Sequence, residues 1–308
     1  MKTNLSISRF TYLFTLILIS SVTFFACSDD DGNAADDDLN IVETAQANDN
    51  FSILVDALVD AELDGALSGA GPFTVFAPTN EAFNALPSGL LESLTNEQLT
   101  EILQYHVLAA EVASTDLEAS QAVATLTEET IFVTVENGSV TINNTADVVT
   151  ADIETTNGVI HAIDGVMLPN KFQNIVEIAS KNYELSTLVS LLVDADLVST
   201  LEGDGPFTVF APTNAAFEEV SATLATLTSE QVREVLTYHA VAAEALSSSL
   251  SDGMTVTTVQ GEDITVNISG GNVTLNENAN VTTVDLQGTN GVVHIIDAVL
   301  LPPSYSAE

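Results

Sequence analysis

The decapeptide GPFTVFAPTN occurs twice in this chain of 308 residues, at residues 71–80 and again at residues 205–214. Shorter matches flank both copies in the same order, among them NIVE before the decapeptide and NGVIHAID or NGVVHIID after it. A repeat of roughly 130 residues is a whole domain rather than a unit of a solenoid. We therefore expect two tandem modules, module 1 over residues 39–170 and module 2 over residues 171–304.

The decapeptide itself predicts a strand followed by a short helix. Its Phe-Thr-Val-Phe run is extended and largely apolar, and the proline that follows ends it. Thr79 or Asn80 then stands where a side chain can cap a helix that runs through Phe83. Thr213 and Asn214 hold the same positions in module 2. We interpret these four polar residues as structural.

A second pair of matches predicts a longer helix that ends in a Tyr-His pair. The sequences Thr-Asn-Glu-Gln and Thr-Ser-Glu-Gln fit the capping box that starts a helix. Apolar residues then recur at helical spacing, and His106 and His239 close that stripe. We expect both histidines to be buried and hydrogen-bonded. Tyr105 and Tyr238 lie at the edge of the stripe and are expected to be partly exposed.

The second half of each module has the alternation and turn signals of antiparallel strands. Strands are expected at residues 130–135, 140–142, 148–153 and 159–167, and at residues 263–268, 273–275, 281–286 and 292–300. His161 and His294 fall in the last of these strands, where a buried histidine usually bonds a backbone carbonyl. Asp164 and Asp297 are expected to hold a turn by accepting backbone N–H groups.

Three boxes therefore occur in both modules: FTVFAPTN-x-AF, the Tyr-His pair, and NGV-x-H-x-ID-x-V-x-LP. In this order they resemble the fasciclin (FAS1) domain over residues 40–302. The resemblance implies an α+β, β-rich fold of two tandem FAS1 domains, each a twisted β-sandwich flanked by several short α-helices. It also implies family roles in cell adhesion and in matrix or surface interaction, and no enzyme activity. Because the family's Tyr-His motif has been proposed to recognise integrins, Tyr105, His106, Tyr238 and His239 are candidate interaction residues as well as core residues.

The N-terminus lies outside this resemblance. Residues 1–26 carry Lys2 and Arg9 before an apolar run and are typical of a signal peptide. Cys27 at its end resembles the lipidated cysteine of bacterial lipoproteins, and residues 27–38 are expected to be a disordered acidic tether. An acidic stretch after that cysteine also resembles the surface-export signal of some outer-membrane lipoproteins. We expect an exported chain, displayed on the outer membrane and touching the membrane only through its lipid; the alternative for the tether is a plain spacer.

Charge restricts the partners. The chain has 5 basic and 44 acidic residues. This balance excludes nucleic acid, and it repels anionic lipid headgroups and acidic glycans unless a divalent cation bridges them. We expect no tightly bound cofactor; weakly bound calcium at the acidic surface would favour weak self-association.

No catalytic or metal site is expected. His161 and Asp164 could be drawn into a Ser-His-Asp set, but the chain has no G-x-S-x-G segment to present a serine. The same two residues are three apart on a strand, so their side chains point to opposite faces and could not share a metal ion.

The leading hypothesis is therefore a non-enzymatic, lipid-anchored surface protein that adheres to cell-surface or matrix proteins or polysaccharides. The alternative is a surface lipoprotein that binds a glycan or lipid in a groove between the modules, which an apolar pocket with a few polar groups would favour. A third reading is a passive spacer.

Overall fold

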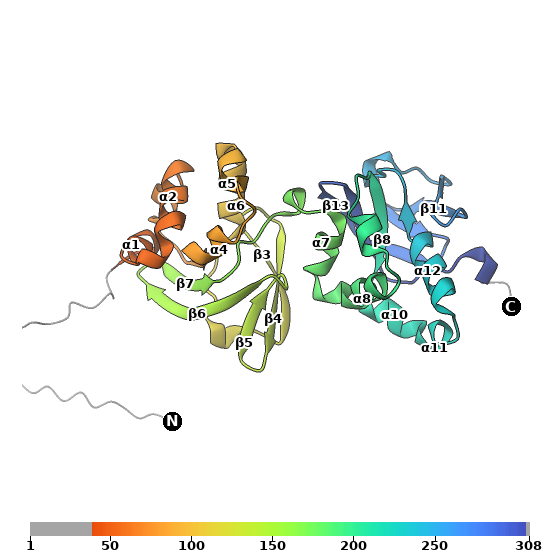
Figure 1. The fold of residues 1–308 in the computed structure, drawn as a ribbon, viewed down its shortest axis with the longest axis horizontal. Coiled ribbons are helices and arrows are strands. Elements are labelled where there is room, and N and C mark those ends of the chain that lie inside the picture. Colours follow the sequence, from red (N-terminus) through yellow and green to blue (C-terminus); the bar gives the residue numbers. More distant parts are fainter. Residues whose placement is uncertain (1–38, 306–308) are drawn as a thin grey trace, which may run out of the picture. The chain divides into compact units, whose positions relative to one another are not determined.

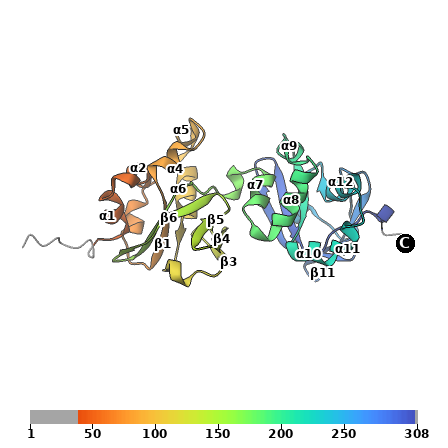
Figure 2. The same cartoon turned by 60° about the horizontal axis from the view of Figure 1, so that its bottom comes forward.

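The computed structural model describes residues 39–305 (Figure 1). The expected signal peptide, Cys27 and the acidic tether lie outside the described residues. Each module consists of one seven-stranded sheet with several short helices (Figure 1, Figure 2). The expected α+β fold of two tandem domains is thus confirmed. Within residues 39–305, no helix is both long and apolar enough to cross a membrane.

The two modules repeat the same order of elements. Module 1 contains α1 (Ile41–Gln46), α2 (Ser52–Asp60), α3 (Asp64–Leu67), β1 (Phe73–Pro78), α4 (Asn80–Asn84), α5 (Leu90–Ser93), α6 (Asn96–Tyr105), β2 (Val107–Leu108), β3 (Ser120–Ala124), β4 (Thr130–Glu136), β5 (Ser139–Ile142), β6 (Ala146–Thr155) and β7 (Gly158–Ile163). Module 2 contains α7 (Ile175–Ser180), α8 (Ser186–Asp194), α9 (Val198–Leu201), β8 (Phe207–Pro212), α10 (Asn214–Glu219), α11 (Ser221–Leu224), α12 (Ser229–Tyr238), β9 (Ala240–Val241), β10 (Thr255–Thr257), β11 (Asp263–Ser269), β12 (Asn272–Leu275), β13 (Ala279–Gly288) and β14 (Gly291–Ile296).

The expected capping boxes start α6 and α12. At α6 the Thr95 hydroxyl accepts the Gln98 N–H at 3.3 Å, and the Gln98 side chain accepts the Thr95 N–H at 2.9 Å. Thr228 and Gln231 make the same reciprocal pair at α12. Each box satisfies two N–H groups that the first turn of a helix leaves without a partner.

In module 1 the strand order is β2-β1-β7-β6-β5-β4-β3, and module 2 repeats it with β9-β8-β14-β13-β12-β11-β10. β1 is antiparallel to β2 but parallel to β7, so the decapeptide strand lies beside the strand of the third box. Their contact is close at Phe73 and Gly158, where a Cβ on the glycine would lie 2.0 Å from the Phe73 carbonyl oxygen. Only glycine fits there, and Gly291 meets Phe207 in the same way in module 2.

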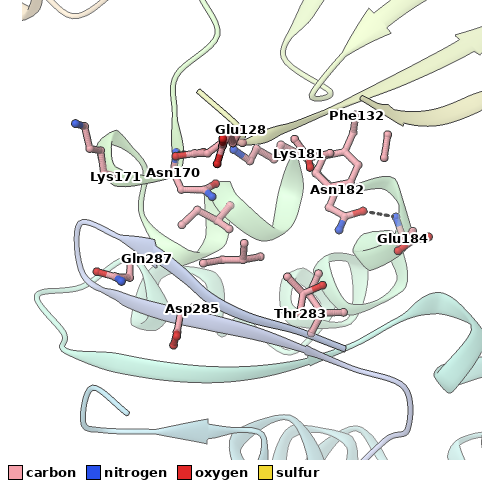
Figure 3. A pocket seen from close by; sticks show the side chains of 16 residues that line it. Glu128, Phe132, Asn170, Lys171, Lys181, Asn182, Glu184, Thr283, Asp285 and Gln287 are labelled. Atoms are coloured by element: carbon pink, nitrogen blue, oxygen red, sulfur yellow. Dashed lines mark hydrogen bonds between the residues drawn. The ribbon is translucent and has the colours of Figure 1, made fainter. Parts of the chain in front are cut away.

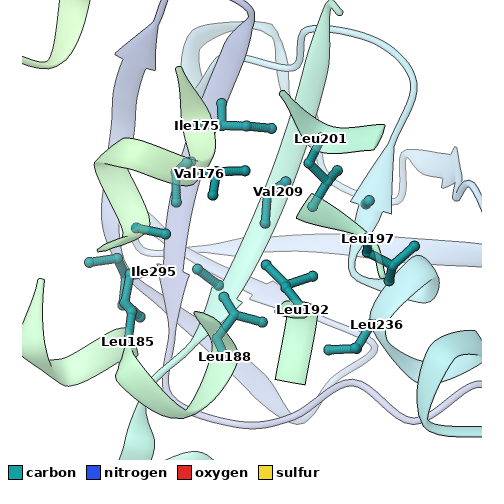
Figure 4. Packing of buried hydrophobic residues seen from close by; sticks show 14 of the residues in the cluster. Ile175, Val176, Leu185, Leu188, Leu192, Leu197, Leu201, Val209, Leu236 and Ile295 are labelled. Atoms are coloured by element: carbon teal, nitrogen blue, oxygen red, sulfur yellow. The ribbon is translucent and has the colours of Figure 1, made fainter. Parts of the chain in front are cut away.

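The sheet has a core on each face. Along β1, Val75 and Ala77 pack with the helices, whereas Phe76 joins a second cluster with side chains of β4 and β5. The sheet therefore nearly closes on itself, and its two halves enclose that second cluster. Figure 4 shows the helix-side core of module 2, where Leu188 and Leu192 of α8 face the sheet.

The start of each module is tied to the turn before its last strand. In module 1 the Asn157 side chain accepts the Ile41 N–H at 2.9 Å and donates to the Leu67 carbonyl at 2.8 Å. Asn290 holds Ile175 at 3.0 Å in module 2. This is the role of the asparagine in the NGV-x-H box.

Two expectations about the strands were wrong. β7 and β14 end at Ile163 and Ile296, before residues 167 and 300, because the chain turns at Asp164 and Asp297. The edge strands β3 and β10 were not expected. In β3 only Val123 packs against a core and the other inward-facing residue is Gln121, so the apolar alternation is too short to mark a strand in the sequence.

Candidate functional site

The histidines of the Tyr-His pairs are buried at the C-terminal ends of α6 and α12. His106 is 2 % exposed; its Nδ1 donates to the Ile102 carbonyl at 2.7 Å and its Nε2 accepts the Met167 N–H at 3.0 Å. His239 is bonded in the same way, by 2.7 Å and 2.9 Å contacts. The expectation of buried, hydrogen-bonded histidines is confirmed.

These bonds fix one neutral tautomer in each module, with the proton on Nδ1. An imidazolium would place a second donor at Nε2, opposite a backbone N–H that needs an acceptor. Burial lowers the pKa of His106 and the pKa of His239 to about 4. Neither ring can therefore exchange a proton near neutral pH without disturbing the core.

Tyr105 and Tyr238 are fully buried, so the expectation that they are partly exposed was wrong. Both belong to the cluster enclosed by the two halves of the sheet. The Tyr105 hydroxyl donates to the Thr130 carbonyl at 3.2 Å and accepts from Asn143 Nδ2 at 3.1 Å. The last turns of α6 and α12 are covered on two sides, whereas the apolar stripe in the sequence indicates only one buried side. This second covered side buries the tyrosines. The structure thus places all four candidate interaction residues in the interior.

His161 and His294 are buried in the last strands. His161 Nε2 donates to the Val112 carbonyl at 2.9 Å, and its Nδ1 accepts the Asp152 N–H at 3.2 Å. The ring stacks on Phe76 with centroids 5.6 Å apart. His294 repeats these bonds, and burial lowers its pKa. The expected bond to a backbone carbonyl is confirmed in both modules.

The structure brings a different aspartate to His161 than the one considered from the sequence. Asp152, at φ +57° in a bulge of β6, accepts the Ser114 N–H at 2.8 Å and also the Ser114 hydroxyl. These bonds lower the pKa of Asp152. Ser114, Asp152 and His161 have the composition of a catalytic triad, but the serine bonds the carboxylate and both ring nitrogens are held by backbone groups. His161 is therefore not placed to act as the general base of a triad for this serine.

The remaining polar residues of the boxes hold turns and caps. Asp164 Oδ1 accepts the Asp147 N–H at 2.7 Å, and Asp297 accepts from Asn280 at the same distance, as expected. Of the two candidate caps it is Thr79 that caps α4, by accepting the Ala82 N–H at 3.3 Å.

Asn80 instead accepts the Ile53 N–H at 3.0 Å and donates to the Asp49 carbonyl at 2.8 Å, so it ties α4 to the start of α2. Thr213 and Asn214 divide the two roles in the same way. Among residues 39–305, no three His, Cys, Asp or Glu side chains are grouped so that they could hold a metal ion.

Sequence reasoning missed a buried lysine where the modules meet. Lys181, at the C-terminal end of α7, is 3 % exposed and donates to the Tyr105 hydroxyl at 3.1 Å. Its Nζ also lies 5.2 Å from the centre of the Tyr105 ring. Burial lowers the pKa of Lys181 to about 8, and the negative charge of Glu129 partly opposes that shift. Phe132 meets Tyr183 edge to face beside it, with centroids 5.7 Å apart.

A cavity of about 630 Å³ lies beside this lysine and is called the junction pocket here (Figure 3). Module 1 contributes strand and loop residues, and module 2 contributes residues of α7, β13 and β14. Its charged lining residues are Glu128, Glu129, Lys171, Lys181, Glu184 and Asp285, and Phe132, Asn170, Ile178 and Leu286 also line it.

The one sequence signal for the junction pocket is that the copies differ there. Thr265 stands at the module 2 position of Phe132, and Ala47 stands at the module 1 position of Lys181.

Both modules match the model of the fasciclin domain, over residues 49–169 and 183–302. The transforming growth factor-beta-induced protein ig-h3 of pig (Sus scrofa) is 34% identical over 248 residues, which are 77% of this chain and 36% of that protein. The chain thus spans about a third of that relative's length. The cell surface glycolipoprotein MPB83 of Mycobacterium bovis is 42% identical over 134 residues, 41% of this chain and 59% of that protein.

The fold is also that of a solved structure, a FAS1 domain pair from the insect cell adhesion molecule fasciclin I. The two superpose with a TM-score of 0.63 at 22% identity, over 84% of this chain and 99% of that chain. The sequence match covers both modules, and the solved relative contains the same pair of domains. The chain therefore belongs to the fasciclin domain family.

Proposed function

We propose that this chain is a non-enzymatic, lipid-anchored cell-surface protein whose two fasciclin domains adhere to cell-surface or matrix proteins or polysaccharides. The observation that carries the proposal is the tandem domain pair, which has its counterpart in an insect cell adhesion molecule. The similarity to a cell surface glycolipoprotein supports the proposed lipid anchor at Cys27 and the proposed location at the cell surface. That the anchor lies in the outer membrane is proposed from the acidic stretch after Cys27 alone.

The state of the four histidines supports a role without catalysis. His106, His161, His239 and His294 are all at most 3 % exposed, and each uses both ring nitrogens in hydrogen bonds to backbone groups. Histidine is the most frequent general base in enzymes, and it must reach the substrate proton to act. These four side chains serve the fold instead.

The charge of the described surface indicates which partners the modules can approach. Of the 44 acidic residues, six aspartates before residue 39 and Glu308 lie outside the described range, which leaves 37 acidic residues against Lys171, Lys181 and Arg233. Lys171 pairs with Glu101, Lys181 is buried, and Arg233 donates to a backbone carbonyl at 2.6 Å. Partners are therefore neutral or cationic, or they are reached through a divalent cation.

The proposal is tested by attachment of whole cells. A strain that lacks the gene should attach less to matrix and to sister cells than its parent. Expression of the intact chain should restore attachment, whereas a Cys27→Ser chain, which cannot be lipidated, should not. A deletion strain that attaches and aggregates like its parent would contradict the adhesive role.

We propose further that calcium acts as a weak bridge between acidic surfaces. Two copies of the protein repel each other until their charge is neutralised, so millimolar calcium should promote self-association. Light scattering that is the same in chelator and in millimolar calcium would contradict this bridge.

A second candidate function is ligand binding between the modules. The junction pocket favours it, because its volume of about 630 Å³ lies within the range of roughly 300–1,000 Å³ that is typical of small-molecule sites. Its lining is more polar than that of most such sites, because 11 of the 16 lining residues are polar or charged and the apolar surface comes from Ala122, Phe132, Ile178, Leu286 and Ile295. A lining of this kind favours a ligand with many hydrogen-bonding groups over the apolar ligand that a mostly apolar pocket would take.

A further inference from the structure

We propose that the junction pocket binds a neutral saccharide of one or two sugar rings. The inference rests on the second candidate function above and names the ligand class for that site. It is independent of whether the outer surfaces of the modules adhere to cells.

The first argument is the hydrogen-bonding capacity that the walls leave unused. An ammonium group carries three N–H donors, and within residues 39–305 the only acceptor bonded to Lys181 is the Tyr105 hydroxyl. On the same wall, Asn170 Oδ1 is buried and has no hydrogen-bond partner among the described residues. A buried polar group without a partner is costly, so both groups favour a ligand that completes their bonds.

A sugar hydroxyl suits both groups because it donates and accepts at the same time. One hydroxyl can accept from Lys181 Nζ while another donates to Asn170 Oδ1. Figure 3 shows the Asn170 and Lys181 side chains on the same side of the pocket, near Glu128. A purely apolar ligand such as an acyl chain would leave both groups unsatisfied and would cost free energy.

The second argument is the apolar part of the wall. Phe132 of β4 lines the pocket and is half-buried, and its edge-to-face contact with Tyr183 restrains the ring. Ile178 and Leu286 contribute aliphatic surface to the same cavity. The C–H face of a sugar ring can pack on these groups while its hydroxyls meet the polar ones, which is how an amphipathic ligand buries its area.

The third argument is the charge of the lining. Four carboxylates line the pocket, from Glu128, Glu129, Glu184 and Asp285, whereas only Lys171 and Lys181 are cationic. Like charges at a binding site suppress the wrong partner, so uronic acids, sulfated sugars and fatty acids are disfavoured. A neutral sugar is not repelled by these carboxylates.

The differences between the two copies supply the variants. Phe132→Thr and Lys181→Ala introduce the residues that stand at the equivalent positions, Thr265 and Ala47, in the other module. Tyr105 keeps its hydrogen bonds to Thr130 and Asn143 in the Lys181→Ala chain. Thr265→Ala is the control, because Thr265 occupies the matching position in the equivalent strand of module 2, β11, and does not line the pocket.

Binding is measured by isothermal titration calorimetry on the chain carrying Cys27→Ser. The probes are cellobiose, mannobiose and N,N′-diacetylchitobiose, with digalacturonate and laurate as charged counterparts. We expect saturable binding of at least one neutral disaccharide with a Kd below about 1 mM. Phe132→Thr should weaken it roughly three- to tenfold, and Lys181→Ala by a similar factor, while Thr265→Ala leaves it unchanged.

Three results would overturn the inference: no saturable binding of any neutral disaccharide, tighter binding of digalacturonate or laurate, or an affinity that neither pocket variant changes. Circular dichroism and urea unfolding of each variant establish that it is folded, so loss of binding is not loss of structure. Cell attachment is measured separately with the Phe132→Thr chain. Attachment that persists when sugar binding is lost would separate the pocket from the adhesive role. A deletion strain that attaches like its parent would contradict the adhesive role but would leave the calorimetry result unaffected.

Discussion

The two buried histidines of the Tyr-His pairs should make the protein lose stability in mild acid. Burial lowers the pKa of His106 and that of His239 to about 4, against 6.5 for a histidine in an unfolded chain. Between these pH values the unfolded state binds a proton that the folded state does not. Each histidine therefore contributes stability that is complete above pH 6.5 and is lost as the pH falls toward 4.

The magnitude follows from the size of the pKa shift. A shift of one pKa unit corresponds to about 1.4 kcal/mol, so each histidine should remove about 2 kcal/mol of unfolding free energy by pH 5 and about 3 kcal/mol below pH 4. Burial also lowers the pKa of His294, so protonation of this ring lowers the stability of module 2 as well. Protonation of carboxylates acts in the opposite direction, because it relieves repulsion within a strongly acidic protein.

A glutamine substitution separates the effect of histidine protonation on stability from that of carboxylate protonation. His106→Gln and His239→Gln keep one N–H donor and one acceptor but do not titrate. Urea unfolding at pH 7.5 and pH 5 should give each variant a lower free energy of unfolding at pH 7.5, by about 1–3 kcal/mol. Its further loss on going to pH 5 should be about 2 kcal/mol smaller than that of the parent chain.

The direct check is an NMR titration, because the chain has 4 histidines and their ring signals can be resolved. The variants assign the signals of His106 and His239. A pKa of 6 or higher for either ring in the folded protein would refute the reasoning. An equal acid loss in parent and variants would refute it as well.

Two further pairs of substitutions test the packing. Gly158→Ala would place a Cβ 2.0 Å from a backbone oxygen of β1, at a residue with φ +151°, so we expect the free energy of unfolding of module 1 to fall by more than about 4 kcal/mol in urea unfolding. Gly65→Ala is the control, because its Cβ would meet no heavy atom within 4 Å, and it should raise the free energy of unfolding by about 0.5–1 kcal/mol. Equal effects of the two substitutions would contradict the close contact at Gly158. Tyr105→Phe should lower the free energy of unfolding by about 1 kcal/mol more than Tyr238→Phe in the same assay, because of the two hydroxyls only that of Tyr105 also accepts from a lysine, Lys181. If the two variants lose the same free energy, the bond from Lys181 contributes nothing to stability.

Local features of the fold could be predicted from the sequence because their causes are local. A capping box lies within four residues, and Thr95 with Gln98 forms the expected pair. The burial of His106 follows from helical spacing alone. The parallel pairing of β1 with β7 has no such signal, because it depends on how segments far apart in the chain come together. Tyr105 was misjudged for the same reason, since the second surface that covers it comes from β4 and β5.

The site was harder to predict than the fold. Asp164 was the aspartate nearest to His161 in sequence, but Asp152 reaches the ring because a bulge turns β6 toward it. The junction pocket takes residues from both modules, and no motif marks it. Its only trace in the sequence is a difference between copies, such as Phe132 against Thr265, and a difference becomes informative only when the structure shows where it lies.

The way each module is tied to its last strand determines how it carries a mechanical load. The chain enters module 1 beside the start of β7, where the Thr156 N–H meets the Leu39 carbonyl at 2.9 Å and Asn157 holds Ile41, and it leaves beyond the end of β7. Traction on the N-terminal side is therefore transmitted along β7, which has β1 on one side and β6 on the other. We therefore expect both ladders of hydrogen bonds to be loaded in shear, so that their bonds break together and not one at a time. In module 2, β14 lies between β8 and β13 in the same way.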